Sequence, residues 1–153
     1  MARQATLQGQ HQKEKRTELA NATEEDLVRD VGKLLTASAA IVAAHENNFG
    51  KEQRSQAIDE FNSLQDEWDR NEDVLKLRVE TYFSTAPIQA KWTEVLDELG
   101  GLDEEIKSLN GFHVSERSSR HAQRIESCRK AMDKAQESLI ELENMMTQFT
   151  QSR

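Results

Sequence analysis

Residues 121–149 carry apolar or small side chains at alternating spacings of four and three, and this stripe constrains the fold more than any other feature of the sequence. Such spacing places every member on one face of an α-helix, which packs on other helices along a narrow seam. The stripe runs without a break through His121, Ile125, Cys128, Met132, Ala135, Leu139, Leu142, Met146 and Phe149. It predicts one long helix with an apolar stripe along its whole length.

Three other segments repeat the pattern. The first carries Leu27, Val31, Leu34, Ser38, Ile41 and His45. The second carries Phe61, Leu64, Trp68, Leu75 and Tyr82. The third carries Ile88, Trp92, Val95, Leu99, Leu102, Ile106 and Leu109. Because the aromatic residues of the second segment lie on its stripe, we interpret them as helix-packing residues.

The breaks between these segments are short. Gly50 follows an asparagine pair and ends the first helix, Pro87 lies near the start of the third, and Gly111 follows its end. Short links between long helices force neighbours to run antiparallel. The sequence therefore predicts an all-α, up-down-up-down four-helix bundle with long slender helices over about 24–47, 51–83, 87–110 and 114–150.

Residues 1–22 are polar and rich in glutamine, and two interpretations stay open for them. Thr23, followed by three acidic residues, resembles the N-cap of the first helix, which would make residues 1–22 a disordered tail. Alternatively, they are a solvated extension of that helix. In both cases residues 23–153 form the bundle.

The net charge and the single cysteine limit the partners and the cellular location that we expect. The net charge is −8, and because residues 1–22 contribute +2, the remainder carries −10. A surface with this much negative charge repels the phosphate backbone of nucleic acids, so we expect no nucleic-acid partner. Cys128 is the single cysteine and the longest apolar run, residues 37–45, is well short of the roughly 20 residues of a membrane span. We expect a cytoplasmic protein.

Counting outward from the turns leaves the last helix longer than its neighbours. This count aligns one layer of four residues, Val31, Trp68, Leu102 and His121. The apolar end of the last helix would then lack a cover, and exposed apolar stripes bind protein partners.

Our leading hypothesis is a non-catalytic module for self-association or for binding a protein partner. Its interaction surface would comprise Leu139, Leu142, Met145, Met146, Phe149, Tyr82 and Phe83.

The main alternative is a ligand-binding or regulatory bundle. Asn71 and Arg78 interrupt the second stripe with polar side chains, and the same count places Arg78 level with Trp92. An inward arginine needs partners, and stacking on an indole beside a carboxylate would supply them. The three residues would then form a pocket for a small-molecule ligand.

Gly100 and Gly101 lie inside the third stripe. Two glycines in a helix interior cost about 1 kcal/mol each relative to alanine. We expect either that they make room for the indole of Trp68 or that they break the third helix.

Enzyme signatures are weak. The four histidines do not show metal-ligand spacing, and His45 and His121 are interpreted as packed, hydrogen-bonded seam residues. We interpret Cys128 as a small buried apolar residue. A carboxylate–metal nucleotide hydrolase using a pair such as Glu94 and Asp97 is the third hypothesis. We expect no catalytic residue, metal or cofactor.

The aromatic spacing of the second helix also carries a family resemblance. With Phe61, Leu64, Trp68, Leu75 and the Tyr82-Phe83 pair, the first two helices resemble the cytosolic helical domains of small bacterial proteins with a single N-terminal membrane span. Those proteins are largely without assigned function, so the resemblance implies no activity. The basic "HQKEKR" at residues 11–16 suits a position at the inner face of a membrane, with the tether missing from this chain.

Overall fold

The computed structural model describes residues 2–47, 49–111 and 119–152, and of residues 2–5 and 119 only the backbone. These residues form four helices, which are α1 (Ala2–Glu46), α2 (Lys51–Tyr82), α3 (Ala86–Asn110) and α4 (Ser119–Gln151). The first begins 22 residues before the predicted start, and the second and third agree with prediction to within one residue. The predicted start of the fourth helix at residue 114 lies outside the described residues.

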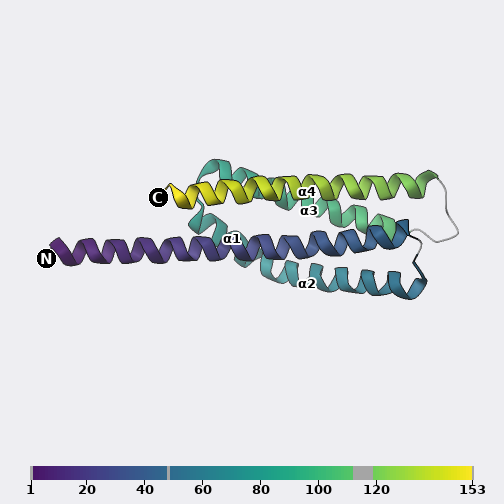
Figure 1. The fold of residues 1–153 in the computed structure, drawn as a ribbon, viewed down its shortest axis with the longest axis horizontal. Coiled ribbons are helices and arrows are strands. Elements are labelled where there is room, and N and C mark those ends of the chain that lie inside the picture. Colours follow the sequence, from purple (N-terminus) through teal and green to yellow (C-terminus); the bar gives the residue numbers. More distant parts are fainter. Residues whose placement is uncertain (1, 48, 112–118, 153) are drawn as a thin grey trace.

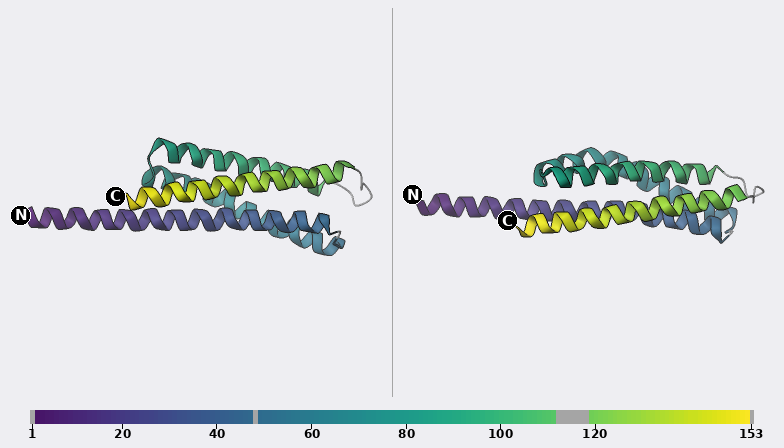
Figure 2. Two further views of the ribbon diagram at one scale, coloured as in Figure 1. Left: turned by 45° about the horizontal axis from the view of Figure 1, so that its top comes forward. Right: turned by 90° about the horizontal axis from the view of Figure 1, so that it is seen from above.

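The helices run up, down, up and down along a common axis (Figure 1). Helix α1 packs against α2 and α4, and α3 packs against α4, whereas the backbones of the neighbouring helices α2 and α3 lie close at few positions. The predicted all-α helical bundle is therefore confirmed. Two further views show the N-terminal part of α1 projecting past the end of α4 (Figure 2).

Residues 2–22 form the helix extension rather than the disordered tail. Thr23, interpreted above as an N-cap, lies inside α1 and is fully buried, and its Oγ1 donates a hydrogen bond to the carbonyl oxygen of Leu19 at 2.8 Å. Ala20 is also buried in the core. Because these small residues pack against the bundle, the helix continues past the acidic stretch that looked like its beginning.

The turn between α2 and α3 is closed by one side chain. Gln89 Nε2 donates hydrogen bonds to the carbonyl oxygens of Val79, at 3.2 Å, and of Phe83, at 2.7 Å. The Val79 carbonyl also accepts the backbone N–H of Phe83, whereas the Phe83 carbonyl follows the last residue of α2, where backbone acceptors lack partners within the helix. Thr85 precedes α3 as its N-cap residue and Pro87 lies in its first turn. The turn is therefore held against the core, with Phe83 fully buried.

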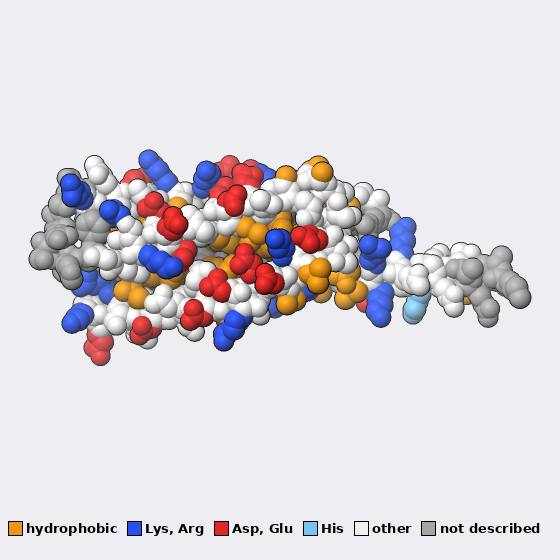
Figure 3. All heavy atoms as spheres, turned by 180° about the vertical axis from the view of Figure 1, so that it is seen from behind, with side chains coloured by type: hydrophobic (Ala, Val, Ile, Leu, Met, Phe, Trp, Pro, Cys, Tyr) orange, Lys and Arg blue, Asp and Glu red, His pale blue; other side chains and the backbone are white. Residues whose placement is uncertain are grey.

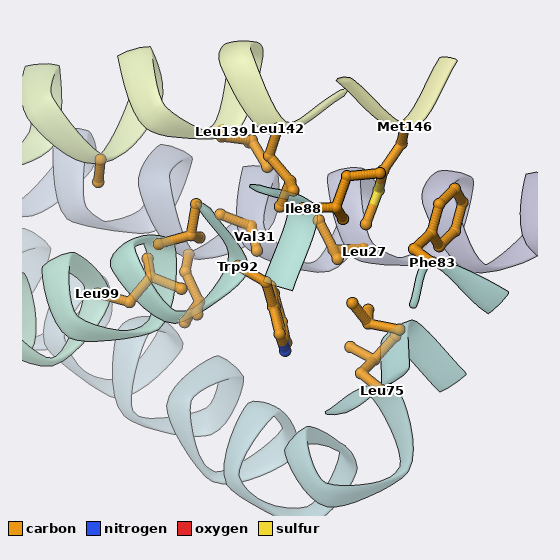
Figure 4. Packing of buried hydrophobic residues seen from close by; sticks show 14 of the residues in the cluster. Leu27, Val31, Leu75, Phe83, Ile88, Trp92, Leu99, Leu139, Leu142 and Met146 are labelled. Carbon is orange, nitrogen blue, oxygen red and sulfur yellow. The ribbon is translucent and has the colours of Figure 1, made fainter. Parts of the chain in front are cut away.

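The core divides into two clusters along the bundle axis. The larger lies toward the α2–α3 turn and includes Leu27, Trp92, Leu142 and Met146 (Figure 4). The smaller lies toward the other end and includes Ile41, Phe61, Ile106 and Cys128. All four helices contribute to each cluster, so the stripes predicted from the sequence do meet in a shared interior.

The two glycines of α3 neither break the helix nor make room for an indole. Helix α3 continues through Gly100 and Gly101, and a Cβ atom at either position would meet nothing within 4 Å. Both earlier expectations are therefore wrong. The indole of Trp68 packs instead against Trp92. Trp92 precedes Gly100 in α3 and therefore lies closer to the α2–α3 turn.

Candidate interaction surfaces

The predicted apolar overhang of α4 is not exposed. Leu142 and Met146 are fully buried, and Leu139 is 6% exposed. Met145 and Phe149 are partly buried against the same cluster. At the end of α2, Phe83 is buried and Tyr82 partly so. The prediction that these residues form an uncovered interaction surface is wrong.

Two structural features that the residue count from the turns did not include cover the end of α4. Helix α1 begins at Ala2, so it lies beside the last turns of α4, where Thr147 Oγ1 donates a hydrogen bond to Glu24 Oε1 at 2.9 Å. The α2–α3 turn also folds inward, and the rings of Phe83 and Phe149 lie 5.6 Å apart. The count assumed that only a polar tail could lie here.

Arg78 forms a structural contact between helices. Its Nε donates to Thr23 Oγ1 at 3.1 Å, and its Nη1 donates to Asp26 Oδ2 at 2.9 Å. Both partners belong to α1. Arg78 interrupts the apolar stripe of α2, and its guanidinium is hydrogen-bonded to a hydroxyl and a carboxylate of α1. We interpret this contact as one that sets the register of α1 and α2.

The predicted pocket of Asn71, Arg78 and Trp92 does not exist. Asn71 is exposed and lies beside Trp68 in a small cleft between α1 and α2. Trp92 is 1% exposed and packs edge to face on Trp68 inside the core. The count misplaced Arg78, which contacts α1 instead of stacking on Trp92. These residues do not converge on one cavity.

Glu94 and Asp97 line one cleft with Glu98 and Glu105, but they do not form a metal site. Across residues 2–47, 49–111 and 119–152, no group of three or more histidine, cysteine or acidic side chains could hold a metal ion. Glu94 instead pairs with Lys91 at 2.9 Å, and Lys91 also reaches Glu141 on α4 at 2.7 Å. This geometry gives the carboxylate–metal hypothesis no support.

Cys128 and the two seam histidines occupy the interior as interpreted from the sequence. Cys128 is fully buried, its thiol donates to the carbonyl oxygen of Glu105 at 3.3 Å, and burial raises its pKa to about 11. A thiol with so high a pKa is a poor nucleophile near neutral pH. His45 Nδ1 and His121 Nε2 lie 3.1 Å apart in a hydrogen bond between α1 and α4.

The most exposed ordered element is the beginning of α1. We call residues 2–16 the arm. The described side chains of the arm, residues 6–16, are all exposed, and Leu7 is 62% exposed. A groove lies where the arm passes the end of α4, lined by Gln10, Glu14, Glu18 and Thr150. The described side chains of the arm are therefore accessible to a binding partner.

A small apolar patch lies on α2 toward the base of the arm. Val74 is 59% and Leu77 is 64% exposed, and the two are three residues apart on one helix face. Arg16 donates to the carbonyl oxygen of Thr81 at 3.4 Å, which joins the arm to this end of α2. Figure 3 shows hydrophobic atoms at the surface close to where the arm leaves the body. The heptad analysis missed the patch because it follows only the core stripe.

Comparisons with known proteins add no relative. No protein-family model, curated protein or solved structure matches the chain. Within the described part of the chain, none of the helices combines the length and the apolar character that crossing a membrane requires.

Proposed function

We propose that this protein is a non-catalytic association module that binds a second copy of itself through the arm. The observation that carries the proposal is the exposure of every described arm side chain while the segment is helical. An isolated helix of this length is marginal in water, since most helix stability in proteins comes from packing. A helix that is polar all round either bridges between units, is stabilised by many side-chain pairs along its own surface, or is unstable.

Charge supports a second copy as the partner. Residues 1–22 carry +2 and the rest of the chain −10, so the arm of one copy is attracted to the acidic body of another. The patch of Val74 and Leu77 lies where a docked arm could cover apolar surface. The association would be electrostatically steered and sensitive to salt.

Sedimentation equilibrium over a range of protein concentrations tests the proposal. The full chain is expected to dimerise and to dissociate as salt is raised. Lys13→Glu with Lys15→Glu should weaken the dimer at least tenfold, because the arm then repels the acidic body. Lys51→Glu with Lys130→Glu is the matched control, since it changes net charge equally at exposed positions outside the arm.

Two results would overturn the proposal. One is a full chain that stays monomeric at every concentration and salt level. The other is a dimer that both pairs of charge reversals weaken equally. A Val74→Ser, Leu77→Ser variant separates the patch from the arm, because it removes apolar contact without changing charge.

We also propose a cytoplasmic location, which the unpaired Cys128 supports, since disulfide bonds are rare there. A position at the inner face of a membrane is supported by Lys13, Lys15 and Arg16, which would lie beside anionic lipid headgroups if a tether preceded them. Co-sedimentation with anionic vesicles tests this. Equal binding to neutral and anionic vesicles would contradict it.

A further inference from the structure

Two imidazole rings join α1 to α4 at the end of the bundle opposite the arm. His45 Nδ1 and His121 Nε2 lie 3.1 Å apart, and the ring centroids lie 5.3 Å apart with planes tilted by 53°. The centroid separation is close to the N···N distance plus the radii of both rings, so the two nitrogens point at each other. This is the geometry of an N–H···N hydrogen bond, in which one ring donates and the other accepts.

The contact depends on how many protons the pair holds. When both rings are neutral, one N–H faces one lone pair and the bond forms. One added proton still leaves one of the rings with a lone pair to accept. A second added proton places an N–H on each facing nitrogen and two positive charges in contact, so the bond is lost and the rings repel.

The surroundings disfavour that second proton. His45 is only 9% exposed, and burial is the main cause that lowers its pKa. The charges of His121 and of Arg54 on α2 lower it further, while the side chain of Asn110 on α3 partly offsets them. From α4, Arg129 pairs with Glu46, next to His45 on α1, and Arg124 bonds to Ser108 on α3.

We infer that the His45–His121 pair is a proton-operated latch that holds α1 and α4 together near neutral pH and opens on acidification. The inference is independent of the arm and of self-association. Arg129 of α4 still pairs with Glu46 of α1 when the histidine pair is released, so the release loosens the adjoining ends of both helices without separating them.

The direction of the pH effect follows from proton linkage. A histidine whose pKa is lower in the folded protein than its ordinary value of 6.5 binds fewer protons when folded. Its contribution to stability is therefore complete above the ordinary pKa and is lost as the pH falls below it. The latch should be weaker at about pH 5 than at about pH 7.5.

A double-mutant cycle measured at both pH values tests the latch. The variants are His45→Gln, His121→Gln and the double variant, with the exposed arm residue changed in His11→Gln as the matched control. Near neutral pH each pair variant should lower Tm, and the double variant should lower it less than the two effects added. In acid this non-additivity should vanish. Non-additivity that is equal at both pH values would overturn the latch.

A second measurement does not depend on how the variants fold. In the wild-type protein, the ring resonances of the pair should respond to pH in two coupled steps, each visible at both rings. Each ring titrating in a single step that the other does not sense would overturn the inference.

Discussion

The indole of Trp68 on α2 meets that of Trp92 on α3 edge to face, with ring centroids 6.4 Å apart and planes at 66°. This is a favourable aromatic geometry. It lies where the backbones of neighbouring helices approach each other least. The two indoles, one from each helix, therefore fill the seam between α2 and α3.

Truncating Trp92 should be the most destabilising change in this seam. Trp92→Ala leaves a cavity in the core and should cost about 3–5 kcal/mol of unfolding free energy. Trp92→Phe should cost only about 1–2 kcal/mol, because Nε1 is buried without a hydrogen-bond partner among the described residues and its removal is no loss. Urea unfolding measures both. Equal costs would contradict the packing described.

The burial of the α4 end predicts a sharp contrast between two nearby residues. Leu142 is fully buried and Ile140 is 50% exposed. Leu142→Ala should cost about 2–5 kcal/mol, whereas Ile140→Ala should stay within about 1 kcal/mol of wild type. Similar small effects at both sites in thermal unfolding would show that this end frays.

The contact of Arg78 with Asp26 should be measurable as a coupling energy. Both side chains are less than one-third exposed, and Arg78 also donates a hydrogen bond to Thr23. A double-mutant cycle of Arg78→Met and Asp26→Asn should give about 1–2 kcal/mol. The pair of Lys107 and Asp103, one turn apart within α3 and with Lys107 67% exposed, is the control and should give about 0.3–0.5 kcal/mol. No difference between the two pairs would remove the register-setting role of Arg78.

Gly101→Ala should stabilise the protein. The glycine lies inside α3 and an added Cβ meets nothing within 4 Å. The gain in helix propensity is about 0.5–1 kcal/mol and should appear as a higher Tm. A lower Tm would mean that a neighbouring side chain needs this space.

Glu24→Gln should raise Tm near neutral pH. Burial, with a smaller effect of Glu143 and Glu25, raises the pKa of Glu24 above its ordinary 4.5, although the Thr147 hydrogen bond opposes this. A raised carboxyl pKa means that ionisation disfavours the folded state, so the gain from glutamine should shrink as the pH falls and Glu24 takes up a proton. Differential scanning calorimetry at several pH values measures the effect. Glu18→Gln, at an exposed position of α1, is the control.

Sequence reasoning identified the residues of the seams better than it matched them across helices. It interpreted His45, His121 and Cys128 as packed interior residues, and all three lie in the seams. It placed His121 level with Trp68, whereas His121 contacts His45 and Trp68 contacts Trp92. The missed helix extension made the end of α4 look uncovered, and the inward-folded α2–α3 turn covers that end as well.

The sequence by itself determined that this chain forms four α-helices in a bundle, because three-four spacing acts within each helix and the turn residues act within a few positions. Only the tertiary structure decided how the helices slide along one another. That register depends on contacts between residues far apart in the chain, such as Thr147 with Glu24 and Arg78 with Asp26. Those contacts cover the end of α4 and leave the arm of α1 exposed, since a polar segment that finds no seam stays in water.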